Sequence, residues 1–275
     1  MVKSYEELTF ADDFMFCKIL QNNPDVCKEL TELILGRKIG NFVEPETQKA
    51  VKITADGHGV RFDVYFEDDQ DTVFDIEMQQ QKSKNLPKRT RYYQGMIDLN
   101  LLNGGAIYEK LSNSYIVFIS LKNPYEDIGL HKYSFRNICV EEPGLEMGDG
   151  ANKVFLSAEG TQHDISDELQ AFLQYVAGKA PSTEITRKLD HLVNEAREHK
   201  EWRMEYMTLL ERDEMMREEG RAEERENTLR EKHRADSAEQ RADSAEQRAD
   251  SAEQRADSLE EEIAILKEQL AALKK

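Results

Sequence analysis

The sequence lacks several features that mark whole classes of protein. It has no run of roughly 18 apolar residues and no apolar segment near its start, so we expect neither a membrane-spanning helix nor a signal peptide. The three cysteines (Cys17, Cys27 and Cys139) and the six histidines have no metal-binding spacing. An odd number of cysteines excludes a complete disulfide framework, and we expect buried, reduced thiols in a cytoplasmic protein. There is no glycine-rich phosphate loop and no dinucleotide-binding motif.

Positive charge is also scarce. The formal net charge is −18, which argues against a protein that coats nucleic acid with its whole surface. Residues 78–97 are an exception, because they contain no acid but include Lys82, Lys84, Lys88, Arg89 and Arg91. Such clusters contact phosphate groups whatever the charge elsewhere. We therefore predict that this segment binds nucleic acid; the alternative is a solvated loop and helix face.

Two short runs with period-two alternation predict a β-hairpin. The runs GVRFDVYF and TVFDIEMQ, between Gly59 and Gln79, flank the acidic turn EDDQD. The apolar side chains fall on one face, so Asp63 and Glu77 meet on the other face, which we expect to be open to solvent. Two neighbouring carboxylates repel unless a cation lies between them, and oxygen ligands suit Mg²⁺. The alternative is a solvated strand face on which the acids merely pair with Arg61.

The rest of the pattern predicts a mixed α/β domain followed by helices. Helices are expected over residues 4–35, broken at Pro24, and from Pro87 to Leu102. Further strands are expected at residues 50–54, 115–122 and 133–141, and helices prevail after Ser166. We divide the chain into a globular domain (1–180), a charged helical extension (181–234) and a heptad-repeat segment (235–275).

The heptad-repeat segment predicts a coiled coil. The unit ADSAEQR occurs three times from Ala235 to Arg255 and continues as ADSLEEE. Alanine and then larger apolar residues occupy the a and d positions as far as Leu273. Glutamate falls at e and arginine at g, so a parallel pair sets Arg241 opposite the partner's Glu246, whereas an antiparallel pair repeats like charges. We predict a parallel homodimer; the alternatives are a higher oligomer and a single solvated helix.

Four pieces of the sequence resemble, in order, the Rpn family of recombination-promoting nucleases, also called PD-(D/E)XK nuclease family transposases. The pieces are DDFMFCKIL, RFDVYF, FDIEMQ and LPKRTRYYQGMI, between Asp12 and Ile97. The resemblance implies an α/β, restriction-endonuclease-like core in the order αβββαβ. It further implies a Mg²⁺-dependent DNA endonuclease that hydrolyses phosphodiester bonds and promotes recombination or transposition.

The same resemblance implies roles for individual residues. Asp63, Glu77 and the backbone carbonyl of Met78 would bind the metal, and Asp13 would hold a metal-bound water or, alternatively, cap its helix. Gln79 stands where the family usually has lysine. A glutamine orients water but supplies no positive charge, so the source of charge stabilisation stays open, with Lys82 as one substitute. In the Arg-x-x-Tyr-Tyr segment, we expect the tyrosines to lie in the core.

Two other functions are consistent with the sequence. Because Gln79 replaces the lysine, the domain is alternatively a catalytically inactive DNA-binding or assembly module of the same fold. A third interpretation is a structural scaffold built around the coiled coil. Metal binding separates the first two from the third, and DNA cleavage separates the first from the second.

Overall fold

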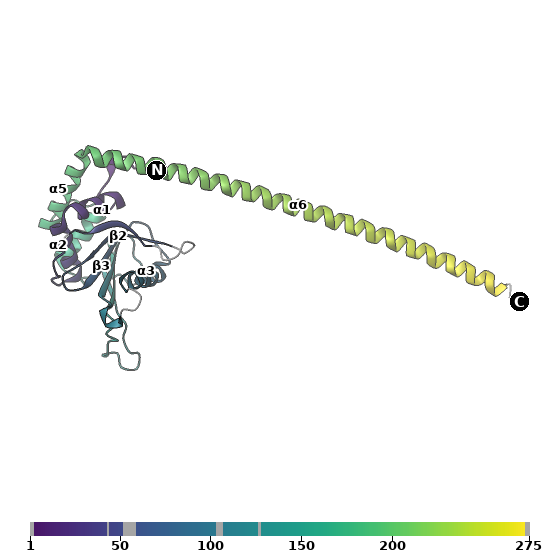
Figure 1. The fold of residues 1–275 in the computed structure, drawn as a ribbon, viewed down its shortest axis with the longest axis horizontal. Helices are drawn as coiled ribbons and strands as arrows, with labels where there is room; N and C mark the ends of the chain where they lie inside the picture. Colours follow the sequence, from purple (N-terminus) through teal and green to yellow (C-terminus); the bar gives the residue numbers. More distant parts are fainter. Residues whose placement is uncertain (1–2, 43, 52–58, 103–106, 126–127, 273–275) are drawn as a thin grey trace. The chain divides into compact units, whose positions relative to one another are not determined.

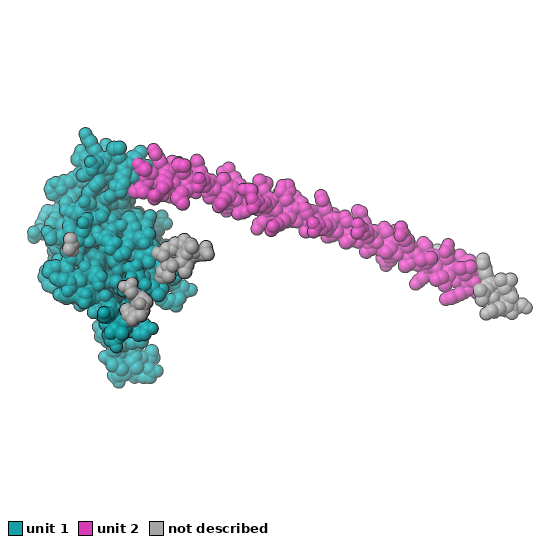
Figure 2. Space-filling model, viewed as in Figure 1, with its two compact units in different colours: residues 1–207 teal, residues 208–275 magenta. Residues whose placement is uncertain are grey.

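The structure, a computed structural model, describes residues 3–42, 44–51, 59–102, 107–125 and 128–272. The chain forms two compact units, residues 1–207 and 208–275, which Figure 2 colours separately. The described part contains no helix that is both long and apolar enough to cross a membrane.

The first unit combines a mixed sheet with helices (Figure 1). Its strands are β1 (Glu46–Val51), β2 (Val60–Glu67), β3 (Thr72–Gln79), β4 (Asn113–Ser120), β5 (Lys132–Phe135) and β6 (Ala151–Ser157). Its helices are α1 (Asp13–Asn22), α2 (Pro24–Leu35), α3 (Leu86–Leu101), α4 (Asp167–Val176), α5 (Glu184–Glu198) and the start of α6 (Lys200–Ala272), with short 3₁₀ turns at Tyr5–Glu7 and Tyr108–Lys110.

Within the described residues, six strands form one sheet in the order β1-β2-β3-β4-β6-β5. The pairs β3–β4 and β4–β6 are parallel, and the other pairs are antiparallel. The predicted hairpin is confirmed as β2 and β3. Its turn is held by Asp68, whose Oδ1 accepts hydrogen bonds from the N–H groups of Gln70 and Thr72, both 3.0 Å. Helix α3 provides the long crossover that parallel pairing of β3 with β4 requires.

Helices cover both faces of the sheet, and this corrects the expectation of a solvent-exposed acidic face. Figure 1 shows α1, α2 and α5 on one side of β2 and β3, and α3 on the other. Leu86, Met96 and Ile97 of α3 belong to a core cluster that includes Val73 of β3 and Phe118 of β4. Val73 lies on the same face of β3 as Asp75 and Glu77. These acids are therefore buried beneath a helix, because the crossover from β3 to its parallel neighbour β4 packs α3 onto this face of the sheet.

Three strands differ from the sequence-based expectation. The strand expected at 133–141 ends at Phe135, and the chain beyond it forms a loop closed by backbone hydrogen bonds such as Cys139 N–H to Leu145 O, 2.9 Å. Strand β6 was not predicted, because its run of apolar residues is short. The strand expected at 50–54 overlaps β1 at Ala50 and Val51, and its remainder lies outside the described residues.

Helix α5, assigned above to the charged extension, packs within the first unit. The Tyr5 hydroxyl donates to the carbonyl of Ala196 at 2.6 Å, and the Arg197 guanidinium donates to the carbonyl of Leu8 at 2.8 Å. The first turns of α6 join this packing through Tyr206, whose ring lies 5.2 Å from that of Phe14. The boundary expected at residue 180 thus falls between two helices of one compact unit.

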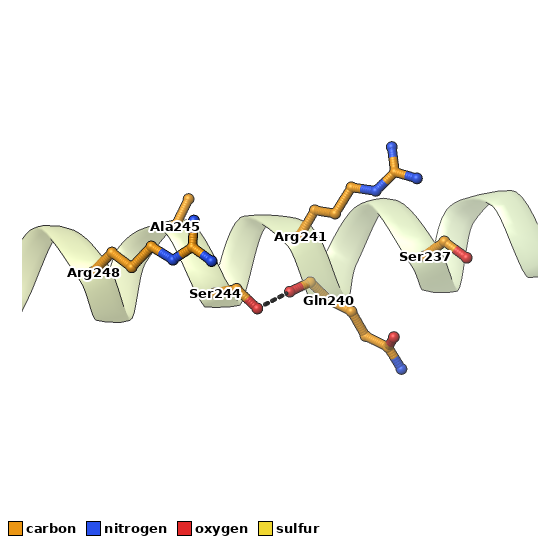
Figure 3. Close-up of a pocket in the computed structure, with 6 residues that line it drawn as sticks. All are labelled: Ser237, Gln240, Arg241, Ser244, Ala245 and Arg248. Carbon is orange, nitrogen blue, oxygen red and sulfur yellow. Dashed lines mark hydrogen bonds between the residues drawn. The ribbon is translucent and has the colours of Figure 1, made fainter.

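The second unit is a single helix that contains the heptad repeats. The described side chains of residues 211–272 are exposed. The serine of each repeat bonds back to its own helix: the Ser244 Oγ donates to the carbonyl of Gln240 at 2.7 Å, beside the projecting side chains of Arg241 and Arg248 (Figure 3). The coiled coil itself stays a prediction.

Candidate active site

Asp63 on β2 and Glu77 on β3 form the centre of the candidate site. Glu77 Oε1 accepts a 2.9 Å hydrogen bond from the backbone N–H of Asp63. In return, Asp63 Oδ2 accepts a 3.1 Å hydrogen bond from the backbone N–H of Met78. The N–H and C=O of one residue point to the same side of an extended strand, so the Met78 carbonyl also faces β2. The three predicted metal ligands therefore lie together.

A break in strand pairing brings α1 to the two acids. The pairing of β1 with β2 passes over Gln48, which has a left-handed φ of 54° and lies opposite Asp63 in the register. The side chain of Gln48 then donates to Asp13 Oδ1 at 3.3 Å and to Cys17 Sγ at 3.2 Å. Non-glycine residues rarely adopt this conformation, and such strain often occurs at functional sites.

Asp13 is therefore a member of the cluster. It is the first residue of α1, but it does not cap the helix, because Asp12 holds the N-cap position. Cys17 lies one turn further on and donates to the carbonyl of Asp63 at 3.4 Å. Ligand atoms of Asp13, Cys17 and Asp63 all lie within 4.8 Å of one another, so these residues could hold a metal ion. Sequence reasoning missed Cys17 and Gln48; the Cys17 position, four residues after Asp13 on a helix, was the available signal.

Burial shapes the electrostatics of the cluster. It raises the pKa of Asp63 above the ordinary carboxyl range, and the neighbouring Glu77 and Asp13 raise it further. Burial likewise raises the pKa of Glu77, against the hydrogen bond from Asp63 and the positive charge of Arg89. The pKa of Asp75 is raised well above its usual value by burial and then by Glu77 and Asp63. Carboxylates packed in this way are stabilised by a bound cation.

Asp75 adds a third acid to the same face. Its side chain is fully buried, and neither carboxylate oxygen has a hydrogen-bond partner. Buried polar atoms without partners are rare in folded proteins, because each costs about 1–3 kcal/mol. Asp75 therefore adds negative charge behind Asp63 and Glu77, whose carboxylate oxygens are ligands of the kind that divalent cations such as Mg²⁺ prefer.

Arg89 is the cation that reaches this cluster from α3. Its Nη2 donates to Gln79 Oε1 at 2.8 Å and lies 3.9 Å from Glu77 Oε2. The guanidinium is stacked over Phe118, with its carbon 4.6 Å from the ring centroid, and 5.6 Å from the centroid of Tyr93. Arg89 was predicted as a phosphate contact, and the structure places it against the acids instead of on the outer helix surface.

An open groove runs past the cluster. It is lined by Asp13, Asp63, Glu77, Met78, Gln79, Lys88, Arg89, Tyr92, Tyr93 and the residues 59–61 and 85. Lys88 and Arg89 are the predicted basic residues in its lining, while Lys82, Lys84 and Arg91 lie exposed outside it. Tyr93 is half-buried against Phe62 and Phe118, as expected, but Tyr92 is 43% exposed in the groove, so its assignment to the core was wrong.

A mixed α/β fold with clustered carboxylates beside a partly basic groove is typical of proteins that hold a divalent cation against a phosphate group. Residues 11–143 match the family model for the PD-(D/E)XK nuclease family transposase. The match confirms the resemblance seen in the sequence. The family indicates a nuclease with DNA as its substrate, and such nucleases generally use divalent metal ions. No curated protein and no solved structure matches the chain.

Proposed function

We propose that the first unit is a Mg²⁺-dependent DNA endonuclease that hydrolyses phosphodiester bonds. The observation that carries this proposal is the Asp63–Glu77 pair, in which each carboxylate is tied to the backbone of the opposite strand at 2.9 and 3.1 Å. The pair opens on a groove that also contains Lys88 and Arg89. The element order α1-α2-β1-β2-β3-α3-β4 is consistent with the αβββαβ core implied by the resemblance.

The proposed roles follow from the positions of the side chains. Asp63, Glu77 and the Met78 carbonyl would hold Mg²⁺, and Asp13 would hold a water beside it. When bound, the metal would polarise the phosphate and activate water. Gln79 contributes an amide that orients water or Arg89. Lys88, with Lys82, Lys84 and Arg91 around the groove, would contact the phosphate backbone and position the DNA.

We further propose that the heptads of residues 235–275 form a parallel homodimer and that the protein promotes recombination or transposition. The a and d residues whose side chains the structure describes, from Ala235 to Leu266, are exposed on the isolated helix, as at Leu259 (57%) and Leu266 (60%). Burial of such side chains favours association. Two linked active sites are suited to cutting both strands of a duplex.

One observation favours an alternative, a DNA-binding or assembly module without nuclease activity. Gln79 supplies no positive charge where the resembling family usually has lysine. In this case the protein would bind Mg²⁺ and DNA without cleaving the DNA.

Incubation of supercoiled plasmid with the full chain and Mg²⁺ tests the proposal. We expect nicked and linear DNA with wild-type protein, none with EDTA, and none with Asp63→Asn. Binding of Mg²⁺ and DNA without cleavage would favour the inactive module. Cleavage that persists in Asp63→Asn would place the activity elsewhere.

A further inference from the structure

We infer that Arg89 supplies, from helix α3, the positive charge that a lysine at position 79 would otherwise provide from strand β3. The inference rests on the proposed endonuclease function. In this role Arg89 binds the phosphate group at which hydrolysis takes place, whereas the other basic residues bind phosphates elsewhere along the DNA backbone.

The position of Arg89 is the first support. Its Nη2 lies 2.8 Å from Gln79 Oε1 and 3.9 Å from Glu77 Oε2, so the guanidinium occupies the space in front of both side chains. A lysine at position 79 would extend from the same strand into this space. Glutamine at 79 is the shorter, uncharged partner that accepts a hydrogen bond from the arginine. Gln79 thus occupies the position of the lysine on β3, and Arg89 supplies the positive charge that this lysine would carry.

The environment of Arg89 is the second support. The guanidinium lies over the ring of Phe118 and near that of Tyr93, and these contacts limit its motion. Its side chain is 34% exposed, so part of it faces the groove, while Nε is buried without a hydrogen-bond partner. A planar, preorganised guanidinium pairs with two phosphate oxygens more readily than a mobile cation does. A residue that only held the outer DNA backbone would not need this aromatic support.

The chemistry needs such a charge. In hydrolysis, the oxygen of water forms a bond to phosphorus while one P–O ester bond breaks, and the protons of water end on the leaving oxygen and on solvent. Negative charge grows on the phosphate oxygens in the transition state. A fixed donor aimed at those oxygens stabilises this state more than the ground state, so it acts on the maximal rate.

The test compares Arg89→Met, Arg89→Lys, Gln79→Lys and the double variant Arg89→Met/Gln79→Lys in Mg²⁺-dependent plasmid cleavage. Methionine keeps the apolar stem against Phe118 without the charge. We expect Arg89→Met to lower the cleavage rate at saturating DNA by about 100- to 1,000-fold, with KM for DNA little changed. The double variant Arg89→Met/Gln79→Lys should cleave at least about tenfold faster than Arg89→Met alone. Arg136→Met, an exposed arginine paired with Glu146 beyond β5, should cleave like wild type.

The outcomes separate the two proposals. An Arg89→Met variant that changes only KM would show that Arg89 merely holds DNA, and would overturn the inference while leaving the endonuclease intact. A slow Arg89→Met that neither Arg89→Lys nor Gln79→Lys improves, with a lowered Tm, would indicate a structural role and also overturn it. Wild-type protein that cleaves no DNA would overturn the proposed function and this inference together.

Discussion

Glu77 Oε1 accepts a hydrogen bond of 2.9 Å from the backbone N–H of Asp63, so the two acids at the centre of the site are fixed to each other's strands. Each acid also serves as the acceptor for a buried N–H group, since Asp63 Oδ2 accepts from Met78 N–H at 3.1 Å. The two side chains therefore have a structural role besides any metal binding. Variants of this pair must keep the acceptor if they are to report on chemistry.

The first prediction concerns Asp63→Asn and Glu77→Gln. Each variant keeps an acceptor oxygen for the backbone N–H, so the fold should be retained, while the affinity for Mg²⁺ falls. We expect plasmid cleavage to decrease at least about 100-fold, because metal ligands matter no less than the groups that support them. Mg²⁺ titration by calorimetry and plasmid nicking measure the two effects.

Asp63→Ala is the matched comparison. It removes the acceptor and leaves the Met78 N–H buried without a partner, which costs about 1–3 kcal/mol. We expect Asp63→Ala to be less stable than Asp63→Asn in urea unfolding, although neither cleaves DNA. Equal stability of the two would show that the hydrogen bond to Met78 contributes nothing.

The second prediction concerns pH and the orphaned acid, Asp75. Burial raises its pKa in the folded state, whereas the unfolded chain has a pKa near 4. Well below pH 4, Asp75 is protonated in both the folded and the unfolded state, so its titration does not lower the free energy of unfolding. As the pH rises from about 4 toward the raised folded value, the unfolded chain releases a proton that the folded protein retains, so the free energy of unfolding falls.

Asp75→Asn removes that titration with little change in shape. In EDTA, the Tm of Asp75→Asn minus that of wild type should therefore increase between pH 5 and pH 8. Comparing the two proteins at each pH cancels the titrating groups that do not interact with Asp75, so the difference reports on Asp75 together with its neighbours Glu77 and Asp63. A difference in Tm that stays constant over this range would show that Asp75 ionises as readily in the folded protein as in the unfolded chain.

The third prediction concerns the basic residues that hold DNA. Lys88 lines the groove and Arg91 lies exposed on the same helix. Lys88→Gln with Arg91→Gln should weaken DNA binding in a sequence-independent way and reduce the slope of log K against log salt by about two, one for each lost phosphate contact. Fluorescence anisotropy at several salt concentrations measures the slope. An unchanged slope would mean that the DNA binds to another surface. The double variant Lys110→Gln with Arg136→Gln loses the same net charge away from the groove and serves as the control.

The sequence was sufficient to predict the hairpin, the meeting of Asp63 with Glu77, and the helix that begins near Pro87. These features depend on the local alternation of apolar and polar residues and on turn residues that end each element. Both can be recognised within a short stretch of sequence. The proximity of Asp13 to the pair was expected only from the resemblance, because it depends on the packing of α1 against β1 and β2.

The sequence could not predict that the acidic face is buried. Alternation distinguishes two faces of a strand, but it does not indicate which face the next helix covers. Helix α3 follows β3 directly in the chain, and only its tertiary packing places it over the polar face. For the same reason, the sequence pattern did not distinguish Arg89 from the other cations expected on the surface. No feature of the sequence indicated the break in strand pairing at Gln48. Strand β6 was missed because a short apolar run is ambiguous between helix and strand.

The last prediction concerns the heptads and uses two neighbouring residues. Ile265 and Leu266 are almost equally exposed on the isolated helix, at 55% and 60%. They differ in register, since Leu266 occupies a d position of the proposed seam and Ile265 a c position outside it. If the helix stays single, Ile265→Asp and Leu266→Asp should behave alike. If it forms a parallel dimer, Leu266→Asp should weaken association strongly, because it places a charge in the seam, and Ile265→Asp should not.

Two variants that change the length of the heptad-repeat segment provide an independent test of the proposed dimer. Deletion of residues 242–248 removes one complete heptad, so it preserves register, shortens the rod by about 10 Å and should leave the oligomer intact. Truncation after Ser258 removes the large apolar residues, each worth roughly 1.5–3 kcal/mol when fully buried, and should yield a monomer. Light scattering measures the mass of each variant. A truncated protein that stays dimeric would place the interface upstream of the repeats, because the alanine heptads alone bury too little apolar surface to hold two helices together.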